Sequence, residues 1–148
     1  MAQPTTINRK EFLQLFGLGA TALVASACLG GCGDKGSDPV PGATGIDFTV
    51  DLAAASSAPL DDPAKGYIYN ANRAVIVAKT TAGSYLALQA PCTHEGTSVF
   101  FEPGQNRFVC PNHGAMFGPA GAVLTGPATI ALKQYTVVQT GTMLRITG

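Results

Sequence analysis

The residues best suited to chemistry occur in two short stretches of this 148-residue chain. His94 follows Cys92 by two positions, and His113 follows Cys110 by three positions. The sequence has only two histidines, and its other two cysteines lie near the N-terminus. Each stretch offers one thiolate sulfur and one imidazole nitrogen, which are ligands for transition metals. A site that needs three histidines cannot exist in one copy of this chain.

Two interpretations of these four residues involve no iron. A disulfide between the cysteines suits an exported protein, but it leaves the proximity of both histidines unexplained. A zinc site of two cysteines and two histidines has a suitable donor set. Zinc sites of this composition usually keep the cysteines together on one turn and the histidines together on a helix. Both interpretations stay open as alternatives.

Residues 85–148 resemble the Rieske family of iron–sulfur proteins. The matching segments are Cys-Thr-His-Glu-Gly at 92–96, Cys-Pro-Asn-His-Gly at 110–114 and Gly-Pro-Ala at 126–128. The resemblance implies one [2Fe–2S] cluster per chain, with Cys92 and Cys110 on one iron and His94 and His113 on the other. It also implies a Rieske-like antiparallel β-sandwich with a small cluster-binding subdomain formed by two hairpin loops.

This ligand set would favour acceptance of an electron. Two thiolates cancel the charge of an oxidised cluster and neutral imidazoles add none, so the oxidised site would be neutral. An all-cysteine cluster starts from a negative charge and is harder to reduce. The resemblance therefore implies a one-electron carrier with a raised potential.

Several positions around the ligands depart from the cytochrome bc type of Rieske protein. In that type each cluster loop has a second cysteine, and the two form a disulfide; the matching positions here are Thr97 and Asn112. That type also has a serine and a tyrosine that donate hydrogen bonds to sulfur, where this chain has Ala115 and Phe117. Fewer such bonds predict a midpoint potential in the lower half of the roughly −150 to +300 mV Rieske range.

Two further residues belong to the resemblance. Gly114 directly follows the second histidine, and Pro127 matches the start of the proline loop that covers the cluster in this family. An ordinary Gly-Pro turn is the alternative interpretation of the second feature.

The elements that must position these residues have the patterns of β-strands. Residues 46–52 alternate between apolar and polar side chains, which predicts a half-buried strand. Three hairpins are predicted, pairing 73–79 with 85–88, 98–101 with 107–110, and 133–139 with 142–146. Residues 53–66 are expected to be irregular, and no window has a helical period. The prediction is an all-β domain, as an antiparallel sandwich or an open barrel.

The N-terminal part has the pattern of an export signal. Arg9 and Lys10 precede the uncharged, mostly apolar residues 12–33. Small residues before Cys32 resemble the lipobox of bacterial lipoproteins, which implies a lipidated Cys32. An uncleaved membrane helix and simple secretion are the alternatives. We therefore expect a signal peptide at 1–31, a lipidated, flexible Gly/Pro linker at 32–45 and a Rieske domain at 46–148.

Composition and length narrow the function. Formal net charge is zero and only 12% of residues are charged, which argues against a nucleic-acid surface. The chain is too short for the mononuclear iron domain of a ring-hydroxylating oxygenase, and both histidines are already assigned. We expect an exported, membrane-tethered electron-transfer protein on the periplasmic side or in the cell envelope, with redox proteins as partners and no substrate chemistry of its own.

Three alternatives remain at this point. The chain could be the Rieske subunit of a quinol-oxidising cytochrome bc-like complex, with quinol as the electron donor. It could be the small subunit of a periplasmic oxidoreductase. The remote alternative is a structural lipoprotein that binds zinc.

Overall fold

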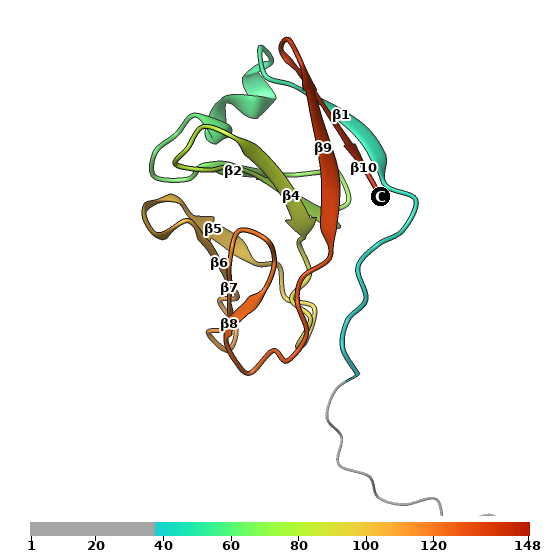
Figure 1. Ribbon diagram of the computed structural model, residues 1–148, viewed down its shortest axis with the longest axis vertical. Coiled ribbons are helices and arrows are strands. Elements are labelled where there is room, and N and C mark those ends of the chain that lie inside the picture. The colour runs from blue at the N-terminus through green and yellow to red at the C-terminus, as the bar shows by residue number, and fades with distance from the viewer. Residues whose placement is uncertain (1–37) are drawn as a thin grey trace, which may run out of the picture. The chain divides into compact units, whose positions relative to one another are not determined.

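The computed structural model describes residues 38–148, which form two antiparallel β-sheets (Figure 1). The larger sheet has six strands in the order β1 (Asp47–Asp51), β10 (Met143–Thr147), β9 (Gln134–Thr140), β4 (Tyr85–Gln89), β3 (Val75–Lys79) and β2 (Tyr67–Tyr69). The smaller sheet has four, β5 (Phe100–Glu102), β6 (Arg107–Val109), β7 (Met116–Phe117) and β8 (Val123–Thr125). Short 3₁₀ helices cover Ala55–Leu60 (η1) and Pro103–Gln105 (η2). The predicted all-β, antiparallel fold is confirmed.

The three predicted hairpins are present as β3–β4, β5–β6 and β9–β10. Five elements were not predicted, namely the 3₁₀ helices η1 and η2 and the strands β2, β7 and β8. The three strands have only two or three residues each. A periodicity of two cannot be recognised in so short a segment, and these strands form because longer neighbours supply their pairing partners.

Strand β3 separates two hydrophobic clusters. Its residues 75–78 are fully buried, and they alternate between the two sides of the sheet as strand geometry requires. Ile76 and Ala78 face the cluster that contains Phe101, Phe108 and Phe117 from the smaller sheet or its neighbours. Their neighbours in β3 face a second cluster that includes residues of β10 and η1. The smaller sheet and its loops are therefore packed on one face of the larger sheet.

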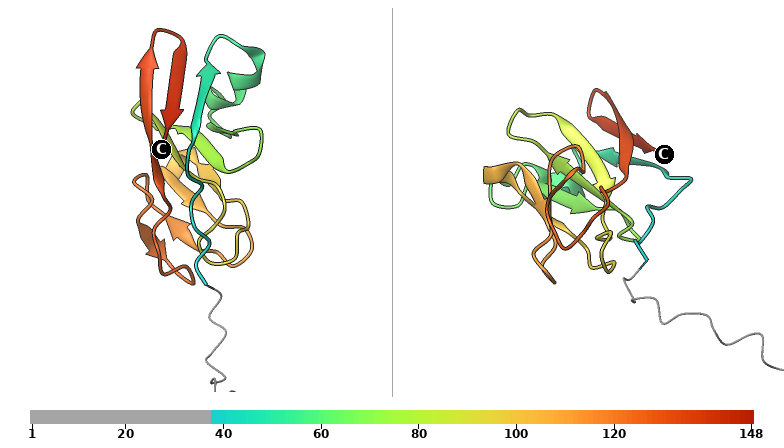
Figure 2. Two further views of the ribbon diagram at one scale, coloured as in Figure 1. Left: turned by 90° about the vertical axis from the view of Figure 1, so that its right-hand side faces the viewer. Right: turned by 60° about the horizontal axis from the view of Figure 1, so that its bottom comes forward.

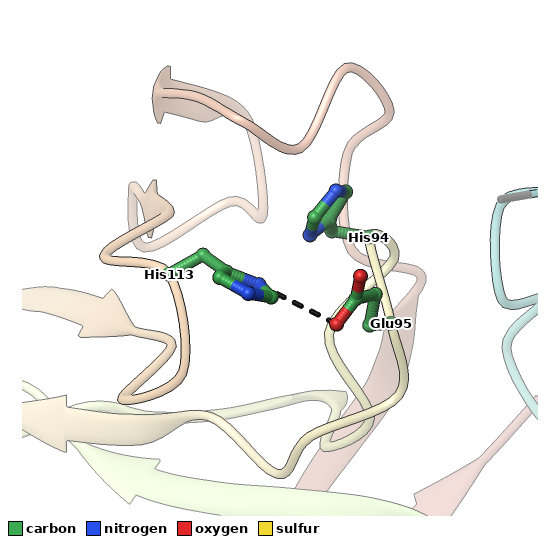
Figure 3. Close-up of side chains that lie close together, drawn as sticks. All are labelled: His94, Glu95 and His113. Carbon is green, nitrogen blue, oxygen red and sulfur yellow. Dashed lines mark ion pairs between the residues drawn. The ribbon is translucent and has the colours of Figure 1, made fainter. Parts of the chain in front are cut away.

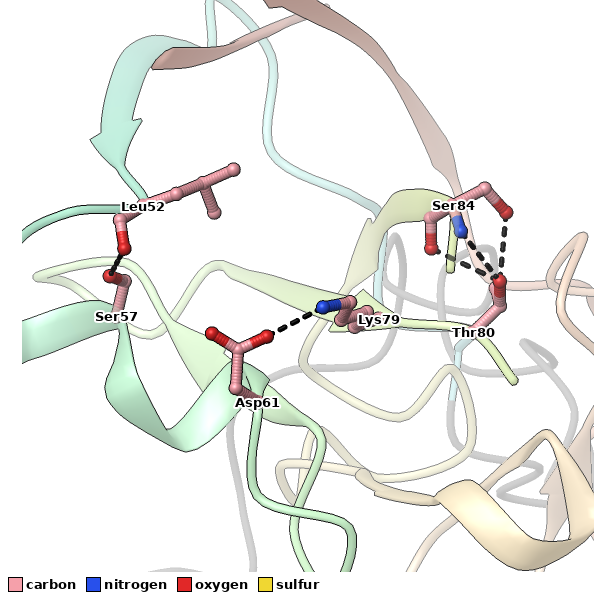
Figure 4. Close-up of polar contacts among 6 residues, drawn as sticks. All are labelled: Leu52, Ser57, Asp61, Lys79, Thr80 and Ser84. Carbon is pink, nitrogen blue, oxygen red and sulfur yellow. Dashed lines mark hydrogen bonds and ion pairs between the residues drawn. The ribbon is translucent and has the colours of Figure 1, made fainter. Parts of the chain in front are cut away.

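The connections at the η1 end of the larger sheet are polar (Figure 4). The Ser57 hydroxyl donates to the Leu52 carbonyl at 3.0 Å. Lys79 forms an ion pair with Asp61, and the Thr80 hydroxyl closes the β3–β4 turn by bonding to Ser84. This part of the larger sheet contributes no residue to the cysteine and histidine positions.

Residues 38–43 form an extended strap along the domain. Figures 1 and 2 show this segment running from the start of β1 toward the end of the domain that carries the loops after β4 and β6. The Ala43 carbonyl accepts hydrogen bonds from Lys133 Nζ and the Tyr135 hydroxyl, both at 2.9 Å. The sequence predicts a flexible linker up to residue 45, whereas the part of it that is described is tied to the domain.

The predicted signal peptide, the apolar run at 12–33 and Cys32 lie outside the described residues. Within residues 38–148, no helix has the length and apolar character needed to cross a membrane.

Candidate metal centre

Two loops carry the four candidate ligands, and they share one backbone arrangement. Loop 1, residues 92–97, follows β4, and loop 2, residues 110–115, joins β6 to β7. In loop 1 the Cys92 amide donates to the carbonyl five residues later, and its carbonyl accepts from the amide four residues later. The Cys110 amide and carbonyl make the same two bonds in loop 2. The four bonds measure 2.8 to 3.0 Å.

A glycine with a positive φ angle closes each loop. Gly96 has φ 75° and Gly114 has φ 71°. This left-handed conformation is open to glycine but costs other residues energy through the clash of Cβ with the backbone. The two glycines explain why the Cys-x-His-x-Gly and Cys-x-x-His-Gly spacings give the same turn.

The two thiols lie on the inner side of the loops. Cys92 and Cys110 are both free and buried, with exposed fractions of 0% and 3%. Burial raises the pKa of the Cys92 thiol above its usual value, the backbone amides of His94 and Glu95 lower it, and the neighbouring Cys110 raises it again. The buried Cys92 thiol resists ionisation unless a positive charge compensates it, and a metal centre supplies such a charge.

The two imidazoles come from different loops and lie close together (Figure 3). Their ring centroids are 5.0 Å apart, and the rings are nearly perpendicular. His94 is half-buried, whereas His113 is exposed. The Glu95 carboxylate is 3.5 Å from His113 Nδ1, and ligand atoms of these three residues lie within 4.8 Å of one another.

The other predicted site residues are distributed around this centre. The Thr97 carbonyl accepts from the Cys92 amide. The Asn112 side chain donates to Glu95 Oε2 at 3.1 Å and thus links the two loops. Ala115, the last residue of loop 2, and Phe117 in β7 are completely buried. Pro127 is exposed in the loop between β8 and β9.

Sequence reasoning missed two polar residues that hold loop 1. Thr93 is buried, and its hydroxyl donates to the Ile130 carbonyl at 2.7 Å, in the same loop as Pro127. Gln89 is only 1% exposed, and its amide group donates to the carbonyls of Val40 and Pro91 at 2.8 Å. The position of Thr93 between two candidate ligands was the one available signal.

The donor set fits a mixed-ligand iron–sulfur cluster. Two buried thiols and two more exposed imidazoles come from two loops that the fold holds side by side, and each loop provides one donor of each type. A [2Fe–2S] centre with cysteines on one iron and histidines on the other requires this set.

Comparison with known proteins gives a family. Residues 49–136 match the family model described as the Rieske [2Fe-2S] domain. The cytochrome b6-f complex iron-sulfur subunit of Chlorobaculum tepidum is 33% identical over 98 residues, which is 66% of this chain and 54% of that protein. The corresponding subunit of Synechococcus elongatus is 29% identical over 94% of this chain and 84% of its own length. This chain thus spans only about half of the Chlorobaculum relative.

Solved structures agree with the family model. The plasma membrane Rieske protein PetC3 from Synechocystis PCC 6803 superposes with a TM-score of 0.52 at 30% identity, covering 63% of this chain and 95% of that one. The ferredoxin of carbazole 1,9a-dioxygenase from Nocardioides aromaticivorans shares the fold, with a TM-score of 0.51 at 20% identity over 71% of this chain and 98% of the ferredoxin. The chain therefore belongs to the Rieske [2Fe-2S] domain family, whose domains bind a [2Fe–2S] cluster and transfer electrons.

Proposed function

We propose that this protein is an exported one-electron carrier, tethered to a membrane, with Cys92, His94, Cys110 and His113 as the cluster ligands. The single observation that carries the proposal is the convergence of two buried thiols and two facing imidazoles on two equivalent loops. The cluster supplies one-electron chemistry when bound.

The buried and the exposed candidate ligands have different proposed roles. The buried thiols of Cys92 and Cys110 hold one side of the centre away from water. His113 is exposed to solvent. We assign to it the contact with redox partners, because electron transfer between proteins needs a ligand close to the surface.

Membrane tethering is proposed from the sequence. The basic residues before an apolar run and the small residues before Cys32 support a lipid anchor on the periplasmic side. An N-terminal helix that stays in the membrane is the alternative form of the anchor. Labelling of the expressed protein with a radioactive fatty acid distinguishes them, since Cys32→Ser removes the label only if the lipid is attached there.

The midpoint potential is proposed to lie in the lower half of the Rieske range. Ala115 and Phe117 have no hydroxyl to offer the sulfur atoms, and each missing bond withdraws stabilisation from the reduced site. Ala115→Ser and Phe117→Tyr should each raise the potential. The backbone amides of His94 and Glu95 interact with the Cys92 sulfur. These two amides should raise the potential and so offset part of this loss.

One observation favours a second candidate, the Rieske subunit of a quinol-oxidising complex. The proteins from Chlorobaculum tepidum and Synechococcus elongatus are named as subunits of cytochrome b6-f complexes. In this alternative quinol is the electron donor. A potential near the top of the Rieske range of roughly +300 mV would favour it over the carrier.

The deciding experiment is a redox titration monitored by EPR on the cluster-loaded protein, together with iron and acid-labile sulfide analysis. A Rieske-type signal in the reduced state with two iron atoms per chain is expected. Zinc in place of iron would refute electron transfer and leave the structural lipoprotein. Neither metal, with Cys92 oxidised to a disulfide, would leave the disulfide interpretation.

A further inference from the structure

The strap has one backbone donor at its centre. Pro39 and Pro41 flank Val40, and because proline has no N–H group, Val40 carries the only backbone donor from residue 39 to residue 41. A residue that precedes proline is also biased toward extended conformations. The sequence therefore prepares an extended segment that presents a single N–H group.

That N–H group bonds to the loop that carries two proposed ligands. The Val40 amide donates to the Thr93 carbonyl at 3.0 Å. Thr93 lies between Cys92 and His94, and its hydroxyl donates to the Ile130 carbonyl. The strap thus holds the peptide that joins a thiol ligand to an imidazole ligand.

The buried side chain of Gln89 fixes the strap from the opposite direction. It donates to the Val40 carbonyl and to the Pro91 carbonyl, so that one amide group joins the strap to the residue before loop 1. Both polar atoms of the Val40 peptide are therefore satisfied by loop 1 or by its approach. Buried polar networks of this kind fix geometry when every member is bonded.

Gly42 allows the strap to approach this closely. A Cβ atom at this position would lie 2.6 Å from Lys133 Cβ and 2.8 Å from Gln89 Oε1. Real Cβ atoms do not occupy such distances, so any larger residue at position 42 must displace the strap or the residues beneath it.

We propose that the strap is a positioning element of the cluster site. In this role Val40 orients the backbone between Cys92 and His94 through its hydrogen bond to the Thr93 carbonyl. The inference rests on the proposed function, because it assigns the strap a role toward the proposed ligands. Among residues 38–148, the strap forms no hydrogen bond with loop 2, and we therefore assign its effect to loop 1.

Val40→Pro is the selective test, carried out on the full, cluster-loaded chain. It removes the N–H donor while keeping the extended backbone that the neighbouring prolines favour. Val40→Ala is the matched control, because it keeps the donor and removes only the methyl groups that lie over Gly96. We expect Val40→Pro to shift the EPR g-values and the midpoint potential and to speed cluster loss to a chelator about tenfold. Val40→Ala should leave the g-values and the midpoint potential unchanged and should speed cluster loss by less than about twofold.

A second pair of variants tests the same contact by crowding. Gly42→Ala places a methyl group against Lys133 and Gln89, whereas a methyl group at Gly104 meets no atom within 4 Å. Gly42→Ala should reproduce the effects of Val40→Pro, and Gly104→Ala should behave as the wild type.

Hydrogen exchange supplies a readout that does not need the cluster. The Gly96 amide donates within loop 1 and the Gly114 amide makes the same bond in loop 2. Val40→Pro should speed exchange at Gly96 about tenfold and leave Gly114 unchanged, because the strap forms its hydrogen bond with loop 1.

One result would overturn the inference, namely a Val40→Pro protein with unchanged g-values, midpoint potential and Gly96 exchange. If the thermal midpoint of that protein is also lowered, the strap is a general stabiliser only. A wild-type chain that binds no iron would refute the proposed function instead, and Gly96 exchange would still decide whether the strap holds loop 1.

Discussion

The two cluster loops have the same hydrogen-bond arrangement but opposite surroundings. Both cysteines are buried, but in loop 1 Thr93 is also buried and His94 is half-buried, whereas residues 111–114 of loop 2 are all exposed. Loop 1 is held by the strap, by Gln89 and by the 126–130 loop. Loop 2 is joined to its surroundings by the Asn112 bond to Glu95.

The difference between the loops indicates two separate tasks. The turn itself is specified locally by a cysteine and a glycine four residues later. Loop 1 additionally forms hydrogen bonds with segments distant in the sequence. We infer that loop 1 sets the position of the centre and that loop 2 presents its histidine to partners.

The largest expected effect should be the same for both loops. Cys92→Ser and Cys110→Ser should each abolish the Rieske EPR signal and the bound iron, because a cluster with one ligand missing is not retained. Cys28→Ser, at a cysteine outside the proposed site, should keep both. A Cys110→Ser protein with full iron content would show that loop 2 does not bind the cluster.

The closing glycines should also cost the same in both loops. Gly96→Ala and Gly114→Ala should each lower the free energy of unfolding by roughly 1–2 kcal/mol, because the cost arises from the left-handed backbone and not from burial. Gly104→Ala should stay within about 0.5 kcal/mol of the wild type. Urea unfolding followed by circular dichroism measures all three, and a cost confined to loop 1 would contradict the shared turn.

The polar contacts should separate the loops. Thr93→Val removes a buried hydroxyl bond and should cost about 1 kcal/mol, a value kept moderate because Ile130 is half-exposed and its carbonyl can turn to water. Asn112→Ala removes an exposed bond and should cost less than about 0.5 kcal/mol. The same unfolding experiment compares them, and equal costs would remove the proposed asymmetry.

The smallest expected effect concerns Tyr69, which bonds to the segment that follows loop 1. This effect on stability should appear at alkaline pH. The Tyr69 hydroxyl donates to the Val99 carbonyl at 2.8 Å. Burial of the phenol, with a contribution from Tyr67 against an opposing one from Arg73, raises the pKa of Tyr69 to about 12 from an ordinary value of 10.0.

The folded state holds this phenolic proton more tightly than the unfolded chain does. Its contribution to stability is therefore complete below about pH 10 and is lost as the pH rises to about 12. Because the side chain is partly open to water, screening should keep the effect below about 1 kcal/mol. Tyr69→Phe should flatten the stability curve between these pH values, and an unchanged slope would assign the titration to another group.

The sequence was informative wherever the structure is local. The β3–β4 hairpin followed from an apolar, β-branched run before the turn at Gly83 and an apolar segment after it, and the two loops followed from cysteine and histidine spacing. The structure brings the two histidines together, while their role as ligands stays a prediction. The supports of loop 1 could not be predicted, because Gln89 and Val40 are 49 positions apart and Thr93 and Ile130 are 37 apart. Such pairs leave no local pattern.

The docked strap shortens the free tether between the proposed lipid anchor and the domain. Only six peptide steps separate Cys32 from the first strap residue, which gives a maximum reach of about 22 Å from the lipid. If the strap were released as far as Ile46, the tether from Cys32 could extend to about 50 Å. The domain would then search a volume about tenfold larger, so docking concentrates the redox centre near any partner in the same membrane by a similar factor.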